Sequence, residues 1–186
     1  TPRSSSAASD VYKRQHLDWS KEGNSPDSIY EEPINDQEDL LGIVNPSLKR
    51  PFDVREVISR IADGSRFEEF KPLFGPTIIC GFMKIHGHTV GVLGNNGSLF
   101  PDSSQKAAHF IQLCNQISIP LVFLQNITGF NIGKEFEQNG SIKKGAQMLN
   151  AVSNSEVPHL TVILGNSYGA GTVSYTHLTL PTSFLV

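Results

Sequence analysis

Apolar and amphipathic segments follow one another in an order that restricts this chain to few folds. Two strands joined by a tight turn come first, and helix, strand, helix and strand follow, at residues 77–85, 89–94, 103–117, 120–126, 141–153 and 160–164. Strands that are separated by crossover helices pair in parallel, which predicts an α/β layer fold. Ligands of such folds bind at the carboxyl ends of the strands.

Glycine-containing turns follow three of these strands, at Asn95–Gly97, Asn126–Phe130 and Gly165–Gly171. Because parallel strands end at one edge of a sheet, we expect the three turns to meet there.

The third turn has the strongest chemical signature. Residues 160–164 predict a buried strand, and a glycine-rich bend and a helix N-terminus are expected to follow it. This sequence of elements aims backbone amides at a developing negative charge. We expect the amides of Ala170 and Gly171 to form such an oxyanion hole, with Gly169 allowing a close approach.

A rival interpretation of this turn is a serine hydrolase. Residues 165–169 spell G-x-S-x-G after a strand, which is the pattern of a nucleophile elbow with Ser167 as nucleophile. An elbow serine requires an acid and a histidine later in the chain. After Gly171 the chain contains one histidine, His177, and no Asp or Glu. The hydrolase stays open as an alternative on residues alone.

Composition limits the class of partner. The chain has a formal net charge of −3, and its N-terminal end contributes Arg3, Lys13 and Arg14 to the basic side. A nucleic-acid or anionic-membrane binder would show a basic excess, so neither partner is expected. No apolar run approaches the length that spans a bilayer. No metal-ligand spacing is present, and Cys80 and Cys114 are expected to be buried free thiols.

The two ends of the chain are interpreted separately from its middle, because their sequences resemble translated adapter sequence. Residues 1–15 and 173–186 resemble in-frame translations of a sequencing adapter in opposite orientations, so we interpret both as scars. Residues 16–48 are polar and acidic at first and predict an inter-domain linker segment. The remaining residues, 49–172, carry the predicted elements.

Local patterns predict which helix faces are buried. Asp53 and Glu56 form a predicted capping box at the start of a helix. The apolar positions of the three helices are expected to face the core; they are Val54, Val57, Ile58 and Ile61, then Ala107, Ala108, Phe110, Ile111, Cys114 and Ile117, then Ile142, Ala146, Leu149 and Val152. The side chains of Arg55, Arg60 and Arg66 are expected to be solvated or ion-paired, with a phosphate contact as the alternative.

Five segments together resemble one family. They are the runs Lys49–Ile58, Asp63–Phe67, Gly94–Gly97, Ile119–Phe130 and Ser167–Gly171. This set is similar to the carboxyltransferase β subunit of biotin-dependent acyl-CoA carboxylases. The run Leu-Gln-Asn-Ile-Thr-Gly-Phe at 124–130 and the Asn-Asn-Gly turn resemble the methylcrotonoyl-CoA branch of that family most.

The resemblance implies a ClpP/crotonase-like ββα spiral, with residues 49–172 as the first part of the C-terminal domain. It implies transfer of CO2 from carboxybiotin, carried on a partner α subunit, to an enoyl-CoA, most directly 3-methylcrotonoyl-CoA in leucine degradation. It also implies a homo-oligomer of β subunits and a mitochondrial matrix location in a eukaryote, or a cytoplasmic one otherwise. The chain is expected to be inactive by itself.

The resemblance also implies the site. It assigns the oxyanion hole to the amides of Ala170 and Gly171 beside Gly169. It places Gly129, Phe130 and the turn Asn95, Asn96 and Gly97 at the border of the biotin pocket. Crotonase-type hydratases and isomerases share the scaffold and stay an alternative, although they place a glutamate near the thioester and none is assigned here.

Overall fold

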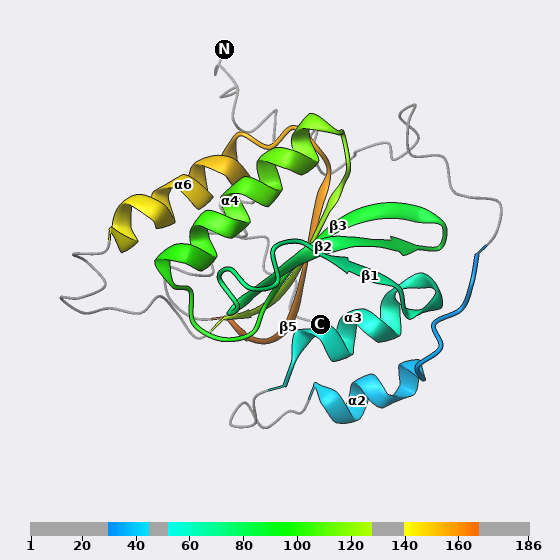
Figure 1. The fold of residues 1–186 in the computed structure, drawn as a ribbon. Helices are drawn as coiled ribbons and strands as arrows, with labels where there is room; N and C mark the ends of the chain where they lie inside the picture. Colours follow the sequence, from blue (N-terminus) through cyan, green and yellow to red (C-terminus); the bar gives the residue numbers. More distant parts are fainter. Residues whose placement is uncertain (1–29, 45–51, 128–139, 168–186) are drawn as a thin grey trace, which may run out of the picture.

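The fold, seen in a computed structural model that describes residues 30–44, 52–127 and 140–167, is built on one sheet of five strands (Figure 1). The strands lie in chain order and are β1 (Phe67–Glu69), β2 (Ile78–Ile85), β3 (His88–Asn95), β4 (Leu121–Ile127) and β5 (His159–Ser167). The pairs β1–β2 and β2–β3 are antiparallel, and β3–β4 and β4–β5 are parallel. The predicted hairpin and the predicted parallel pairing are therefore confirmed, whereas β1 was not predicted.

Helices cover both faces of the sheet. Their bounds are α2 (Leu40–Ile43), α3 (Val54–Ile61), α4 (Pro101–Gln116) and α6 (Ser141–Ser153), with 3-10 turns η1 (Gln37–Asp39) and η2 (Asp63–Ser65). The helices α4 and α6 lie side by side on one face, and α3 with α2 lies on the other (Figure 1). Among the described residues, no helix is both long and apolar enough to cross a membrane.

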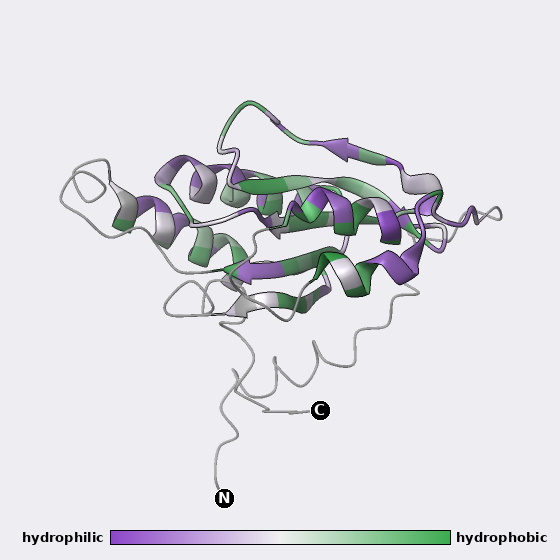
Figure 2. Cartoon of the chain, turned by 90° about the horizontal axis from the view of Figure 1, so that it is seen from below, coloured by the Kyte–Doolittle hydropathy of each residue, from purple (hydrophilic) through white to green (hydrophobic). Residues whose placement is uncertain are grey.

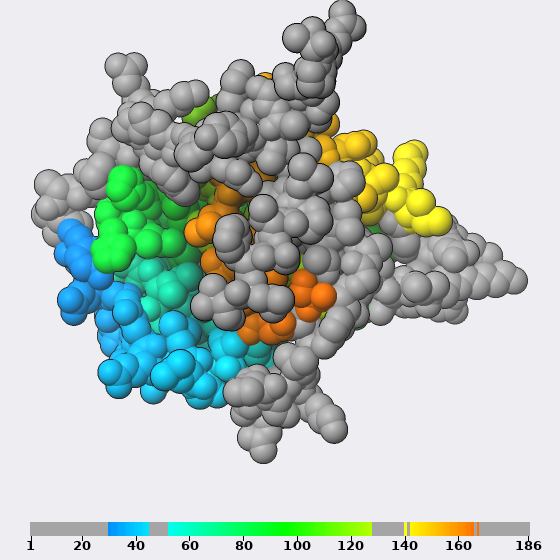
Figure 3. All heavy atoms as spheres, turned by 180° about the vertical axis from the view of Figure 1, so that it is seen from behind, coloured from blue at the N-terminus to red at the C-terminus, as the bar shows by residue number. Residues whose placement is uncertain are grey.

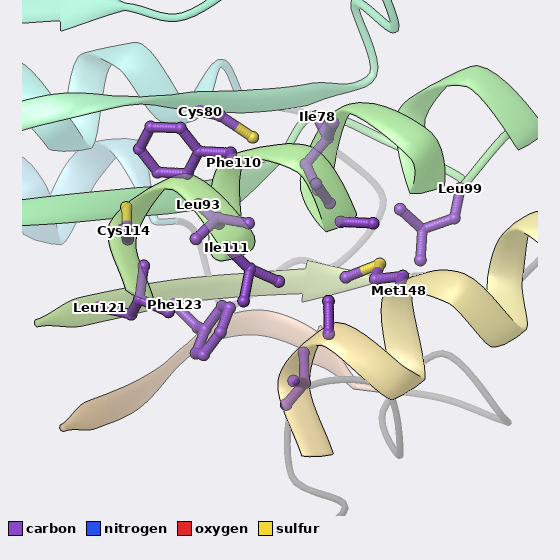
Figure 4. Packing of buried hydrophobic residues seen from close by; sticks show 14 of the residues in the cluster. Ile78, Cys80, Leu93, Leu99, Phe110, Ile111, Cys114, Leu121, Phe123 and Met148 are labelled. Carbon is purple, nitrogen blue, oxygen red and sulfur yellow. The ribbon is translucent and has the colours of Figure 1, made fainter. Parts of the chain in front are cut away.

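The larger core lies between the sheet and the pair α4–α6 (Figure 4). Phe110 and Ile111 of α4, Phe123 of β4 and Met148 of α6 meet there, and none of them is exposed to solvent. Burial of one such side chain stabilises the fold by about 1.5–3 kcal/mol. This core fixes the two crossover helices on one side of the strands.

A second core lies between the sheet and α3. Val54 and Ile58 of α3 pack there against Val122 and Leu124 of β4, all of them buried. Successive residues of β4 therefore point to opposite cores, which is why its sequence is an unbroken apolar run. Figure 2 shows the same result in colour, with hydrophobic residues concentrated in the central strands and the helices carrying both kinds.

The start of α4 differs from the expectation. Pro101 occupies the first turn, and Phe100 precedes it in an extended conformation, so Ser103 and Ser104 lie inside the helix and do not cap it. Proline suits this position because it has no N–H to leave unpaired and its φ is already helical. The Ser103 hydroxyl instead lies 2.6 Å from the Thr77 hydroxyl, before β2.

The buried face of α6 was predicted only in part. Val152 is buried as predicted, but Ile142 is 77% exposed and Ala146 is exposed as well, whereas Met148 and Ala151 are buried. The helix has the predicted bounds but is turned, because it packs on α4 through Met148 and the residues one turn later. Two apolar faces with similar spacing cannot be ranked by periodicity alone.

Strand β5 is longer and more exposed than predicted. It runs through Gly165 to Ser167, so the first part of the predicted glycine bend is strand. It forms an edge of the sheet, and Leu160 and Ile163 are each more than half exposed. Figure 3 shows β5, in orange, reaching the surface on this side. The expectation of a buried strand was therefore wrong in this structure.

Candidate active site at the carboxyl edge of the sheet

Three parallel strands end at the same edge. Gly94 of β3 lies opposite Leu124 of β4, and Ile127 of β4 lies opposite Ser167 of β5. The turn Asn95–Gly97 therefore emerges beside the ends of the next two strands, as predicted. The other predicted site residues, Gly129, Phe130, Gly169, Ala170 and Gly171, lie outside the described residues and stay predictions.

The turn after β3 combines a buried residue with an open one. Asn95 is fully buried and lies opposite Ile78 in the β2–β3 ladder. Two residues later Gly97 has φ +133, and a Cβ built on it would meet nothing within 4 Å. Only glycine adopts this backbone readily, so the turn presents unobstructed main chain to its surroundings.

Asn96, between these two residues, is held by three hydrogen bonds. Its backbone N–H donates to the Thr77 carbonyl (2.9 Å). Its Nδ2 donates to Asp53 Oδ1 (2.7 Å), and its Oδ1 accepts from the Val54 N–H (2.7 Å). The carboxamide is therefore engaged with the N-terminus of α3, and the turn is tied to both β2 and α3.

Asp53 caps α3, but without the predicted reciprocal partner. Its Oδ1 accepts from the Arg55 N–H at 2.9 Å, one position earlier than the capping box requires. Glu56 does not reach back, because its carboxylate pairs with Arg60 Nη1 at 2.8 Å. Burial raises the pKa of Asp53, but hydrogen bonds from Asn96 and Arg55 outweigh it and hold that pKa below its ordinary value.

Arg55 links Asp53 to Glu69 in β1. Its Nε and Nη2 donate to the two carboxylate oxygens of Glu69 in β1, both at 2.9 Å, and its Nη1 lies 3.2 Å from Asp53 Oδ2. The bidentate bond to Glu69 is the main cause of a raised pKa for Arg55. Arg60 and Arg66 are ion-paired as well, so the expectation for all three arginines is confirmed.

Lys106 of α4 ends this chain of charges inside the protein. Its side chain is completely buried, its Nζ donates to the Ile78 carbonyl at 2.9 Å, and Glu69 Oε1 lies 3.9 Å away. Burial lowers the pKa of Lys106. Sequence reasoning missed this residue, although a lysine one turn before the buried Phe110 on an otherwise apolar helix face was a usable signal.

A hydrogen bond between an amide and a hydroxyl side chain joins the ends of β4 and β5. Gln125 is fully buried, and its Nε2 donates to Ser167 Oγ at 3.0 Å. The β4–β5 register shifts between Gln125 and Ile127, and such bulges re-aim side chains near sites. Gln125 Oε1 is buried and accepts no hydrogen bond from the described residues.

The described residues 30–44, 52–127 and 140–167 contain no group of three or more His, Cys, Asp or Glu side chains that could hold a metal. Cys80 and Cys114 are free and buried, as predicted, and burial raises the pKa of both thiols, that of Cys114 to about 12. The described part of this edge carries the main chain of Gly97 and the carboxamides of Asn96 and Gln125.

Comparison with known proteins decides the family. Residues 14–179 match the family model described as "Carboxyl transferase domain". This chain belongs to the carboxyl transferase family. Its fold matches the crotonase-like structures of that family.

Several carboxyl transferase relatives share half or more of their aligned residues with this chain. A Drosophila melanogaster protein named "Probable methylcrotonoyl-CoA carboxylase beta chain, mitochondrial" is 62% identical over 147 residues, which are 79% of this chain and 25% of that protein. The Dictyostelium discoideum methylcrotonoyl-CoA carboxylase beta chain, mitochondrial, is 57% identical over 141 residues, 76% of this chain and 24% of that protein. The chain thus spans about a quarter of the length of these relatives.

Solved carboxyl transferases have the same fold. The beta subunit of geranyl-CoA carboxylase from P. aeruginosa matches with a TM-score of 0.77 at 48% identity, over 81% of this chain and 29% of that one. The transcarboxylase 12S subunit, solved as a hexamer with methylmalonyl-coenzyme A and methylmalonic acid bound, matches with a TM-score of 0.75 at 33% identity, over 85% and 33%.

Proposed function

We propose that the full-length protein carboxylates an enoyl-CoA, most directly 3-methylcrotonoyl-CoA, with a carboxyl group brought by biotin on a partner α subunit. The observation that carries this proposal is the 62% identity to a relative named for that substrate. A role in leucine degradation follows from that choice of substrate.

The carboxyl edge of the sheet is the proposed reaction site. Biotin, when bound, supplies the carboxyl group, and this chain's contribution is to orient it and stabilise negative charge. We assign charge stabilisation to the backbone amides of Ala170 and Gly171, and the border of the pocket to Gly129, Phe130 and the turn Asn95–Gly97. Preorganised amides in a site that excludes water stabilise an oxyanion at no cost in reorganisation.

Two features of the described residues support the fit of a biotin ureido ring at this edge. Gly97 faces open space, which leaves room beside the turn. Gln125 Oε1 is a buried acceptor without a donor among the described residues, and the ureido ring carries an N–H donor. A buried acceptor left unpaired costs about 1–3 kcal/mol, so a ligand that pairs with it gains affinity.

The proposed partners follow from the β-subunit relationship. They are a biotin-carrying α subunit and further copies of the β subunit, supported by the hexamer of the transcarboxylase 12S subunit. Three relatives are named mitochondrial, so we propose the mitochondrial matrix if the source is a eukaryote and the cytoplasm otherwise.

The serine hydrolase is the less supported function. Ser167 is the last residue of β5 and accepts a hydrogen bond from the Gln125 amide. The family model that the chain matches over residues 14–179 is a carboxyl transferase and not a hydrolase. A fluorophosphonate probe tests this alternative directly. We expect no labelling of Ser167, and labelling there would favour the hydrolase.

The test of the proposed function is an assay of the full-length subunit assembled with its biotin-carrying partner. Labelled bicarbonate and ATP are supplied with 3-methylcrotonoyl-CoA, geranoyl-CoA or propionyl-CoA, and incorporation into each is measured. We expect the largest kcat/KM with 3-methylcrotonoyl-CoA, and none when avidin blocks the biotin. Equal or greater preference for another ester would overturn the substrate, and avidin-resistant incorporation would overturn the function.

A further inference from the structure

The side chain of Asn96 is bonded to the N-terminus of α3, while its backbone belongs to the turn Asn95–Gly97. Both of its polar atoms are engaged by α3, through Asp53 Oδ1 and the Val54 N–H, each at 2.7 Å. A carboxamide can donate and accept at once, and this one does both. Asn96 is therefore not available as a ligand contact through its side chain, although Gly97 beside it faces open space.

The partner of Asn96 is itself fixed by a relay of charges. Asp53 pairs with Arg55, Arg55 holds Glu69 through two bonds, and Glu69 lies 3.9 Å from the buried Lys106. This relay connects α3, β1 and α4. Charge-assisted and bidentate bonds are stronger and more specific in geometry than neutral ones, so the relay holds Asp53 in one place.

The last residue of the relay, Lys106, is connected through Ile78 to the turn Asn95–Gly97. Lys106 Nζ donates to the Ile78 carbonyl, and Ile78 lies opposite Asn95 in the β2–β3 ladder. Asn95 and Asn96 are thus fixed from two directions, one through the interior and one through α3. Glu69 is mostly buried and Lys106 is completely buried. Solvent and salt therefore screen the charge interaction between these two residues little.

We propose that Asn96 is a positioning residue, which holds the turn Asn95–Gly97 in the conformation that receives the biotin ring, and that the Asp53–Arg55–Glu69–Lys106 relay keeps Asn96 in register. This inference rests on the proposed function and gives one of its pocket residues a different role. Small displacements of a positioning element reduce the rate without removing any reacting group.

The test uses the full-length subunit with its biotin-carrying partner, with the concentrations of the partner and the acyl-CoA varied separately. Asn96→Ala is expected to lower kcat/KM for the biotin carrier by about 10- to 100-fold. The KM for the acyl-CoA should stay within about twofold, because its groups are not held by this turn. Arg60→Gln is the matched control, because it removes two ion pairs of α3 that do not reach the turn.

Swapping the side chains of Asn96 and Asp53 distinguishes a positioning role from a general loss of stability. Asn96→Asp places two carboxylates together and should lose activity at neutral pH. The double variant Asp53→Asn with Asn96→Asp restores one amide and one carboxylate but loses the Asp53–Arg55 ion pair, so its kcat/KM for the carrier should lie between that of Asn96→Asp and that of the wild type. Failure of this rescue would overturn the inference. So would equal changes in the KM for the biotin carrier and the KM for the acyl-CoA in Asn96→Ala. An inactive wild type would instead contradict the proposed function.

Discussion

Asn96 Nδ2 lies 2.7 Å from Asp53 Oδ1, although 43 positions separate the two residues in the sequence. This bond joins the turn after β3 to the N-terminus of α3. It also adds to the helix cap, because the same oxygen accepts from the Arg55 N–H.

This pair should be coupled in stability. Asn96→Ala is expected to lower the free energy of unfolding by about 1–3 kcal/mol, because it leaves the Val54 N–H without an acceptor and removes a donor to the Asp53 carboxylate. A double-mutant cycle with Asp53→Ala, followed by urea unfolding, should give a coupling energy of about 1 kcal/mol. Additive effects of the two substitutions would contradict this.

Acid should weaken the same region. The folded pKa of Asp53 is lowered from 3.8, so its stabilising contribution is present above that pH and is lost as the pH falls through the folded value. Asp53→Asn should therefore flatten the loss of stability below about pH 4. Thermal unfolding of both proteins over that range measures it, and parallel pH profiles would refute the role of this carboxylate.

Alkali should destabilise the larger core. Burial raises the pKa of Cys114 from 9.0 to about 12 and raises that of Cys80 as well. The unfolded chain then releases these protons first, so stability is constant below the unfolded pKa and falls above it, by about 1.4 kcal/mol per pH unit for each thiol. The lowered pKa of Lys106 makes stability rise with pH, which opposes the effect of the thiols. It is one group, however, and the thiols are two.

The check on the thiols is the melting temperature as a function of pH. Cys114→Ala should make the alkaline decline shallower, at some cost in packing at neutral pH. A decline of unchanged slope in this variant would show that the thiol does not cause it.

Lys106 should be required for stability in spite of its buried charge. Lys106→Met keeps most of the volume but leaves the Ile78 carbonyl without its donor and Glu69 without its second cation. We expect a loss of about 1–3 kcal/mol in urea unfolding. An equally stable or more stable variant would mean that the cost of burying the ammonium group exceeds what its contacts return.

Two glycines offer a matched pair of substitutions. A Cβ at Gly91 would lie 2.6 Å from Cys114 Sγ and 3.1 Å from Leu121, whereas one at Gly42 would meet nothing within 4 Å. Gly91→Ala should destabilise by about 1–3 kcal/mol, and Gly42→Ala in α2 should be neutral or stabilise by up to about 1 kcal/mol. Thermal unfolding of both variants checks the contrast, and similar shifts would contradict it.

Much of the fold could be predicted because its signals are local. The hairpin over 77–94, the bounds of α6 and the parallel strands follow from period, turn residues and the order of elements. The three-residue strand β1 was missed because so short a segment has no measurable period. The buried face of α6 was predicted correctly at Val152 and missed at Met148 and Ala151, because tertiary packing on α4 decides between two apolar faces.

The common edge at which the parallel strands end was predictable, and the side-chain contacts beside it were not. Strand order alone predicts that the three turns lie at one edge. The role of Asn96 was not predictable, because its partner Asp53 lies on another element, and nothing in a turn motif shows where a carboxamide points. Glu69 and Lys106 were missed for the same reason, since long-range ion pairs leave no local pattern.

In the proposed function, biotin meets this chain at the carboxyl ends of its parallel strands. Hydrogen exchange of the full-length subunit, with and without its biotinylated partner at saturation, tests this contact. We expect slower amide exchange at 95–97, 126–130 and 167–171 and unchanged exchange at the 86–88 turn on the opposite edge. Protection at 86–88, or none at the three strand ends, would contradict it.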